Sequence, residues 1–269
     1  MSVTIELMLL AIDIGNTHIT LGLFDKGAWR RQWRLRTEHD KTEDEYGIYI
    51  KTLLWEEEVS DRIDAAIISS VVPPLSTAFV AVCQRYLGRE PLVVDSRANT
   101  GVRILTDNPA EVGADRIVNT AAAHALYPGA AIVVDMGTAT TFDVVSANGE
   151  LVGVAIAPGL GLAAAALSNK AAQLGRVSLE APPSAIGQNT VHAMQSGIIF
   201  GYTALVEGMV RRLISEWGEQ DVQVIGTGGL ISIINEHTDI FDHIEPWLTL
   251  DGLRVIYQLN ASDLLGQNS

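Results

Sequence analysis

Residues 9–29 read LLAIDIGNTHITLGLFDKGAW, and residues 131–151 read AIVVDMGTATTFDVVSANGEL. Each stretch has an apolar run, an Asp-x-Gly turn, a second apolar run and a turn that contains Gly, which is typical of two strands joined as a hairpin. At a constant offset of 122, the matching residues are Asp13 with Asp135, Gly15 with Gly137, and Gly27 with Gly149. The repetition predicts two related halves, which we place at residues 1–125 and 126–269.

The composition supports a folded protein and argues against nucleic acid as a partner. The chain has 269 residues, of which 48% are hydrophobic and 19% charged, so it can bury a sizeable core. Its 18 Lys and Arg residues against 32 Asp and Glu residues give a net charge of -14. Phosphate backbones are held by clustered cationic side chains, and no cationic surplus exists here.

The apolar segments predict no membrane anchor and no secretion signal. Apolar residues occur in short runs, well below the ~18 to 20 consecutive positions that a membrane-spanning helix needs. The run at residues 7–12 ends at Asp13 and has no basic segment before it, unlike a signal peptide. We therefore expect a cytosolic protein. The single cysteine, Cys83, is predicted to be a buried structural thiol.

Strand and helix patterns alternate along the chain, which predicts an α/β fold. Residues 65–72 (AAIISSVV) are typical of a buried strand. Thr42 and Glu45 have the spacing of a capping box before an amphipathic helix. Residues 190–217 have helical spacing but contain three glycines, at positions 197, 201 and 208. Each Gly costs a helix about 1 kcal/mol relative to Ala, unless another segment must approach closely.

The first Asp-x-Gly turn has the chemistry of a phosphate or metal site. Asp13 ends a buried strand, and its carboxylate is suited to holding a hydrated metal ion. Gly15 allows a ligand to approach the backbone, while Asn16 and Thr17 offer donors for phosphate oxygens. The alternative is an ordinary hairpin turn in which Asp and Asn only satisfy backbone groups.

The second turn favours the ligand interpretation. It reads DMGTATT from Asp135 to Thr141 and offers three hydroxyl groups. A turn without function has little reason to repeat both its Asp and its Gly. Two such turns facing one cleft would hold the two ends of a triphosphate, with Mg²⁺ offsetting the charge of the aspartates, so we predict phosphate binding.

A third segment, residues 107–116, reads DNPAEVGADR. Asn108 as N-cap, followed by Pro and by Glu111, predicts the start of a helix that continues to about residue 125. Gly113 inside that helix would let a substrate lie against its first turns. Asp115 is suited to accept a hydroxyl proton, and Arg116 to hold a carboxylate by two parallel hydrogen bonds. The alternative is a surface ion pair or a brace between the halves.

Other nucleotide and catalytic motifs are missing from the sequence. It contains neither the P-loop pattern nor a Gly-x-Gly-x-x-Gly after the first strand, and no Gly-x-Ser-x-Gly elbow. The six histidines show no metal-ligand spacing. Residues 226–229 (GTGG) follow an apolar run and suit either a seat for a nucleotide's sugar or base, or a plain turn between a strand and a helix.

Five segments together resemble the type III pantothenate kinase family. They are DIGNT at 13–17, DNPAEVGADR at 107–116, VVDMGTATTFDVV at 133–145, IGQNTVHAMQSG at 186–197 and TGGL at 227–230. They follow the family's order over nearly the whole chain, and GADR and DMGTATT are quite specific. Family members catalyse the first step of coenzyme A synthesis in many bacteria.

The resemblance implies two duplicated actin-like (ribonuclease H-like) α/β domains around an ATP cleft. It implies ATP-dependent phosphorylation of pantothenate by a homodimer, whose substrate site is completed at the subunit interface, with Mg²⁺ and a monovalent cation, K⁺ or NH₄⁺, as cofactors. Asp135 would hold the monovalent cation and Asp115 would be the catalytic base. The implied ATP contacts are Asp13, Ile14, Gly15, Asn16, Thr17, His18, Ile19, Thr20 and Thr138. The implied pantothenate contacts are Gly113, Ala114, Asp115, Arg116 and Thr190.

The chain departs from the family pattern just before DNP, where it has Leu105-Thr106 in place of an expected tyrosine in the pantothenate pocket. This departure bears on substrate affinity more than on reaction type. Two other functions stay open on the sequence: a kinase of the same fold with another small hydroxylated acid or sugar, and a non-catalytic ATP-binding regulator, because some family members were first described as accessory factors in transcription. Asp115 beside Arg116 argues against the regulator, because a binding module does not need a base.

Overall fold

The computed structural model describes residues 7–170 and 177–266. The chain divides into two compact units. Unit 1 comprises the residues up to Val102, Asn108–Ala122 and the residues from Thr249 on, and unit 2 comprises Arg103–Asp107 and Ala123–Leu248. We had expected the continuous halves 1–125 and 126–269; in the structure the C-terminal residues pack with unit 1, and residues 103–107 with unit 2.

The repeated sequence forms the centre of each sheet. Unit 1 has a five-stranded sheet of order β3-β2-β1-β4-β5. The first three strands are antiparallel neighbours, whereas β4 and β5 continue the sheet in parallel. The strand bounds are Leu9–Ile14 (β1), His18–Asp25 (β2), Ala28–Arg36 (β3), Ala65–Ser70 (β4) and Leu92–Val93 (β5). The predicted buried strand after residue 64 is therefore confirmed as β4.

Two helices cover one face of the unit 1 sheet. They are α1 (Glu43–Glu56) and α2 (Pro73–Val82), and a π-helical turn at Cys83–Leu87 follows α2. The capping box is confirmed, because Thr42 and Glu45 hydrogen-bond reciprocally at the start of α1. Cys83 is fully buried as predicted, and burial raises the pKa of its thiol to about 12.

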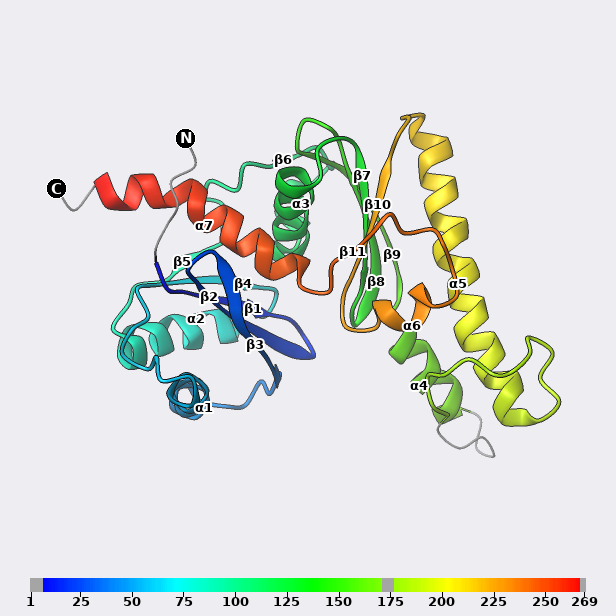
Figure 1. Cartoon of the computed structure of the whole chain (residues 1–269), viewed down its shortest axis with the longest axis horizontal. Coiled ribbons are helices and arrows are strands. Elements are labelled where there is room, and N and C mark those ends of the chain that lie inside the picture. Colours follow the sequence, from blue (N-terminus) through cyan, green and yellow to red (C-terminus); the bar gives the residue numbers. More distant parts are fainter. Residues whose placement is uncertain (1–6, 171–176, 267–269) are drawn as a thin grey trace. The chain divides into compact units, whose positions relative to one another are not determined.

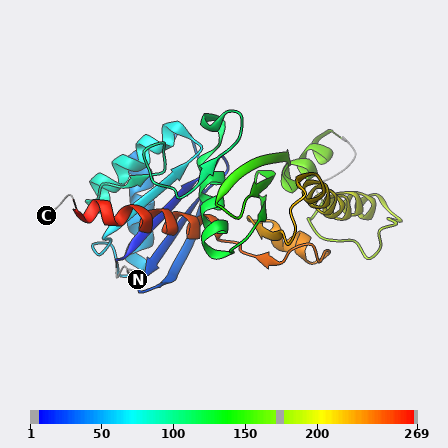
Figure 2. The same cartoon turned by 90° about the horizontal axis from the view of Figure 1, so that it is seen from above.

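The last helix covers part of the other face of this sheet. Helix α7 (Leu248–Gly266) runs along the strands of unit 1, opposite α1 and α2 (Figures 1 and 2). Trp29 on β3 donates to the carboxylate of Asp251 over 3.0 Å, and the guanidinium of Arg254 lies 5.4 Å from the ring centre of Phe24. These contacts join α7 to the β2–β3 hairpin, far from its neighbours in sequence.

Unit 2 repeats the sheet of unit 1. Its strand order, written from the edge that matches β3, is β6-β9-β8-β7-β10-β11. Strands β9, β8, β7, β10 and β11 correspond to β3, β2, β1, β4 and β5 of unit 1, and β6 is added at one edge. The antiparallel and parallel pairings also recur in the same order. The bounds are Arg103–Ile104 (β6), Ala131–Met136 (β7), Ala139–Val145 (β8), Glu150–Pro158 (β9), Gln223–Thr227 (β10) and His243–Ile244 (β11). The prediction of two duplicated α/β units is confirmed.

Helices α4 (Leu160–Lys170), α5 (Thr190–Trp217) and α6 (Ile231–Asn235) lie on one face of the unit 2 sheet (Figure 1). Helix α5 has the bounds that the sequence predicted. Its glycines at 197, 201 and 208 are exposed, and a Cβ atom added at any of them would meet open space. No segment of the described structure therefore requires these glycines. None of the described helices is long and apolar enough to cross a membrane.

The predicted continuous helix from Pro109 is wrong. The segment forms a short 3₁₀ helix at Pro109–Glu111, an extended residue at Val112, and then α3 (Ala114–Leu126). Asn108 does not cap a backbone N–H; its amide donates instead to the carboxylate of Glu111 over 2.7 Å. The carbonyl of Gly113 accepts from the backbone N–H of Arg116, so Gly113 stands before the first turn of α3 rather than inside a helix.

Candidate active site

The first Asp-x-Gly turn places Asp13 in a row of side chains that crosses four strands. Asp13 on β1 lies opposite Thr20 on β2 and beside Ser69 on β4, and Thr20 lies opposite Arg34 on β3. Directly paired residues point to the same face of a sheet. The Ser69 hydroxyl donates to Asp13 Oδ1 over 2.5 Å, which orients the carboxylate.

Backbone contacts fix the shape of this turn. The N–H of Gly15 donates to the carbonyl of His18 over 3.0 Å, and the Thr37 hydroxyl donates to the carbonyl of Gly15 over 2.7 Å. Asn16, Thr17 and His18 at its tip are exposed. Because the side chains of Ile14 and Ile19 lie fully buried in the core, only their backbone can contact a ligand.

The second turn builds the corresponding row in unit 2. Asp135 lies opposite Thr141 and beside Thr227, and Thr141 lies opposite Ile156 on β9. The turn itself is one residue shorter than the first, because β7 ends at Met136 and β8 begins at Ala139. Thr138 lies in this short turn, and its carbonyl accepts from the N–H of Gly159 over 3.1 Å.

Residues 226–229 lie next to the second turn. Gly228 has a φ of +94°, and a Cβ atom there would lie 2.5 Å from Asp135 Oδ1 and 2.7 Å from the backbone of Met136. Only Gly fits such a left-handed position in close contact with a carboxylate. The segment is a turn from β10 toward α6, and it packs against the Asp135 carboxylate.

The third segment places Asp115 and Arg116 in the first turn of α3. Asp115 Oδ1 accepts from the backbone N–H of Arg116 over 2.9 Å and lies 3.8 Å from Arg116 Nη1. The Asp115 side chain is 35% exposed and that of Arg116 19%. A Cβ atom at Gly113 would lie 2.5 Å from Asp115 Oδ1, so the missing side chain at 113 makes room for this carboxylate.

Two further predicted residues lie in unit 2. Thr190 is the first residue of α5, is exposed, and follows the N-cap Asn189, whose side chain accepts from the N–H of His192. Leu105-Thr106 stands where the resemblance implies a tyrosine, and Leu105, which follows β6, is 46% exposed. The hydroxyl of its neighbour Thr106 is buried without a hydrogen-bond partner in the described residues.

A family model for type III pantothenate kinase matches residues 9–212. The chain belongs to the type III pantothenate kinase family. A type III pantothenate kinase from Roseiflexus sp. (strain RS-1) is 48% identical over 256 residues, which cover 95% of this chain and all of the relative. Another from Dehalococcoides mccartyi (strain CBDB1) is 49% identical over 253 residues, 94% of this chain and 96% of the relative.

Solved structures that resemble this type III pantothenate kinase confirm its actin-like fold. A protein from Campylobacter jejuni described as a Baf family transcriptional activator superposes with a TM-score of 0.62 at 18% identity, covering 94% of this chain and 99% of that one. Component A of the (R)-2-hydroxyglutaryl-CoA dehydratase from Acidaminococcus fermentans does so with a TM-score of 0.55 at 13% identity, covering 96% and 99%. At these identities the likeness concerns the fold alone.

The predicted site residues of the kinase are divided between the two units. Unit 1 holds Asp13–Thr20 and Gly113–Arg116, and unit 2 holds Asp135, Thr138 and Thr190. Sequence reasoning missed Ser69, which donates to Asp13, and it named residues 226–229 without predicting that Gly228 packs against Asp135. Ser69 lies in a predicted strand, but only the pairing of β4 with β1 shows that it neighbours Asp13.

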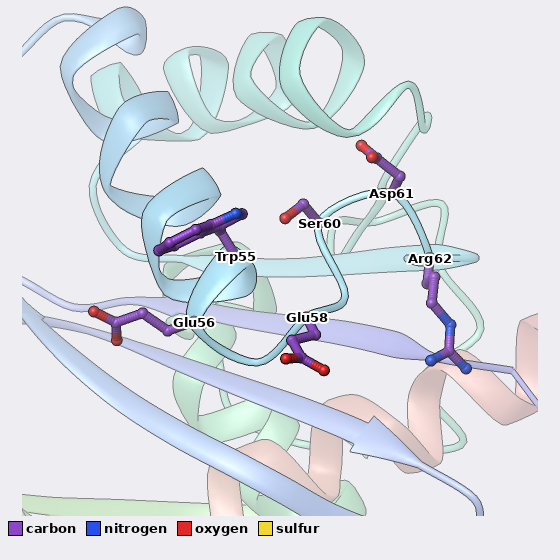
Figure 3. A pocket seen from close by; sticks show the side chains of 6 residues that line it. All are labelled: Trp55, Glu56, Glu58, Ser60, Asp61 and Arg62. Atoms are coloured by element: carbon purple, nitrogen blue, oxygen red, sulfur yellow. The ribbon is translucent and has the colours of Figure 1, made fainter.

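A surface cavity of about 540 Å³ in unit 1 contains none of these residues. It lies at the end of α1 and in the loop that follows, where the side chain of Trp55 stands opposite Ser60 and Asp61 (Figure 3). Its lining residues are Trp55, Glu56, Glu58, Ser60, Asp61 and Arg62. The sequence predicts the phosphate and substrate site in the turns described above, and none of the predicted residues lines this cavity.

Proposed function

We propose that this type III pantothenate kinase transfers the γ-phosphoryl group of ATP to the primary hydroxyl of pantothenate, with Asp115 as the base and Arg116 as the partner of the substrate carboxylate. The observation that carries the proposal is the placement of Asp115 and Arg116 side by side at the start of α3. A proton acceptor and a carboxylate-binding guanidinium are the two groups that a hydroxylated acid requires.

Asp115 is suited to the task by its surroundings. It is partly exposed, so a substrate hydroxyl can reach it, and Gly113 leaves its oxygen uncrowded. Phosphoryl transfer needs little covalent chemistry from a protein, so alignment and charge neutralisation should supply most of the acceleration.

The two Asp-x-Gly turns are suited to ATP and its cations. Each offers one carboxylate with neighbouring hydroxyl groups, the hard oxygen donors that Mg²⁺ and K⁺ prefer. We assign Asp13, Gly15, Asn16, Thr17 and Thr20 to the nucleotide phosphates and Mg²⁺, with His18, Ile14 and Ile19 lining the same turn. We assign Thr138 to ATP and Asp135 to a monovalent cation, which would lower the repulsion between the carboxylates and the phosphates.

The deciding experiment measures ADP release with ATP, Mg²⁺ and pantothenate, with and without K⁺. We expect Asp115→Asn to keep its fold and its ATP affinity while losing turnover by a factor on the order of 10² to 10⁴. Glu111→Gln is the matched control, because its carboxylate lies in the same segment and, among the described residues, hydrogen-bonds to Asn108 alone. Parent-rate turnover by Asp115→Asn, or turnover with other hydroxylated acids but not with pantothenate, would contradict the assignment.

We also propose that the protein works as a homodimer that is joined through unit 2. The three exposed glycines of α5 lie on one face of the helix, because residues four and seven or eight apart share a face. Such small residues allow a second helix to approach closely. Several large apolar side chains of unit 2 are also exposed: Ile156 (64%), Leu162 (56%), Leu167 (43%), Ile186 (82%) and Val191 (51%).

Sedimentation velocity tests the dimer. The parent protein should sediment as a dimer, and Gly201→Arg should sediment as a monomer, because a long charged side chain prevents close approach at the α5 face. The control is Glu216→Arg, which introduces the same side chain at an exposed position in the last turn of α5 and should stay dimeric. A monomeric parent would refute the proposal.

A further inference from the structure

The edge strand of unit 1 carries cationic side chains beside the Asp13 turn. Arg34 lies opposite Thr20, which lies opposite Asp13, and one step further along the strands Arg36 lies opposite His18. Because strand residues two apart share a face, both arginines point to the same face as Asp13. The intervening residue, Leu35, packs against the core on the opposite face.

This end of the face is open in unit 1. Helix α7 contacts the other end of the same face, where its Leu250 approaches Gly22 and its Asp251 binds Trp29. His18, Arg34 and Arg36 are exposed, and in the described residues the Arg36 side chain has no ion-pair partner. The Arg36 guanidinium is therefore available to an anion held at the Asp13 turn, and the exposed Arg34 adds a second positive charge on the same face.

Distance and charge favour the phosphates of a nucleotide as that anion. Neighbouring strands lie about 4.8 Å apart, so β3 is about 10 Å from β1, a gap that an Arg side chain and a phosphate group can bridge together. A chain with a net charge of -14 repels a triphosphate at long range, and local cations must offset that repulsion. Guanidinium groups bind phosphate oxygens through paired hydrogen bonds.

We propose that Arg34 and Arg36 bind the phosphate oxygens of ATP from the edge strand, on the side of the nucleotide opposite to Ser69. This inference rests on the proposed function, because it takes the Asp13 turn as the nucleotide site. It adds two binding residues that lie outside the Asp-x-Gly turn. The two positive charges complement the phosphates in the same place where Asp13 alone would repel them.

The test compares Arg34→Gln and Arg36→Gln with Arg31→Gln. Arg31 is on the same strand, but it binds Glu57, which Arg30 also contacts, so Arg31→Gln removes an equal charge away from the turn. Each test variant should raise the KM for ATP and the Kd for ADP on the order of 10-fold, with a nearly unchanged KM for pantothenate. Arg36→Lys should recover part of the loss because it restores the charge.

Direct titration with Mg·ADP keeps the inference separate from the proposed function, because it requires no phosphoryl acceptor. If the parent binds ADP but shows no turnover with pantothenate, the proposed substrate is wrong. The ADP affinities of Arg34→Gln, Arg36→Gln and Arg31→Gln still decide the role of the arginines in that case. Unchanged ADP affinity in Arg36→Gln, or an equal loss in Arg31→Gln, overturns the inference. A melting curve for each variant shows that the fold is kept, and Arg36→Gln alone suffices if Arg34→Gln is unstable.

Discussion

The two units carry the same cross-strand row with different chemistry at one end. In unit 1 the row is Arg34, Thr20, Asp13 and Ser69, and in unit 2 it is Ile156, Thr141, Asp135 and Thr227. The aspartate and a hydroxyl on each side of it are kept in both. The edge position has a cation in unit 1 and a 64% exposed isoleucine in unit 2.

We infer that the two duplicated halves share one role, at the aspartate, and differ in a second role, at the edge of the sheet. A carboxylate between two hydroxyls offers the oxygen donors that cations prefer, and we propose such a site in each unit. The arginine end of the first row suits the charged part of a nucleotide, whereas an exposed isoleucine suits a partner surface or an apolar part of a ligand. The predictions below test whether the two rows are distinct.

The largest expected effects concern the two aspartates. Asp13→Asn should raise the Mg²⁺ concentration for half-maximal activity by roughly 10- to 100-fold, and Asp135→Asn should do the same for K⁺. Each loses one charged ligand while its neighbouring hydroxyls remain. Steady-state rates over separate Mg²⁺ and K⁺ titrations measure both shifts.

We expect Asp13→Asn to change the dependence of activity on Mg²⁺ alone, and Asp135→Asn to change its dependence on K⁺ alone. The parent protein and the Glu111→Gln control should show ordinary saturation for both ions. If both aspartate variants lost Mg²⁺ dependence alike, the rows would serve one metal site, and the separation of roles between the units would be wrong.

A second prediction concerns the glycine that packs against Asp135. Gly228→Ala should lower the free energy of unfolding by about 2 to 3 kcal/mol, because a left-handed residue gains a Cβ atom that collides with the Asp135 carboxylate. Gly27→Ala is the control, because Gly27 also has a positive φ but has open space around it, and should cost only about 1 kcal/mol. Urea unfolding of both variants measures the difference, and equal losses would show that Gly228 is not pressed against Asp135.

A smaller effect is expected at Ser69, on the parallel side of the first row. Ser69→Ala removes the hydroxyl that donates to Asp13 and should cost about 1 kcal/mol of stability. It should also raise the KM for ATP a few-fold, because Asp13 loses its orientation. Ser70→Ala should leave that KM unchanged, because the Ser70 hydroxyl hydrogen-bonds to the backbone of Val72 in its own turn. A parent-like KM in Ser69→Ala would mean that the hydrogen bond does not orient the carboxylate.

The sequence predicted the repeated hairpins, the capped helix α1 and the long helix α5, because in each case local spacing decides the structure. It could not predict features that depend on pairing between distant strands. The offset of 122 aligns Thr20 with Phe142, but the shorter second turn places Thr141 opposite Asp135 instead. The arginines on β3 stand beside Asp13 only through that register.

Local sequence signals gave a wrong helix start in the segment before α3. Asn108, Pro109 and Glu111 form a strong helix start, yet the extended Val112 ends that turn and Gly113 begins a second helix. The grouping of the C-terminal helix with unit 1 depends on Asp251, Arg254 and their contacts with the first hairpin, which no local pattern contains.

The smallest expected effect is a change in the titration of His18, which reports directly on the arginine end of the first row. Burial, and then the charges of Arg34 and Arg36, lower the pKa of His18 from its ordinary value of 6.5. Because the folded protein resists protonation of His18, the unfolded chain binds more protons as the pH falls through 6.5. This group therefore lowers stability in acid and has no effect well above that pH.

Arg36→Gln should move the pKa of His18 upward, toward its ordinary value, and weaken this acid sensitivity. An NMR titration of the His18 ring protons measures the shift, and the unfolding midpoint from pH 5 to pH 8 measures the linked stability. Arg31→Gln should leave the pKa of His18 where it is, because Arg31 lies at the other end of β3 and binds Glu57. If His18 titrated identically in both variants, the Arg36 guanidinium would not lie beside the turn, and the contrast between the charged row of unit 1 and the apolar edge of unit 2 would lose its electrostatic basis.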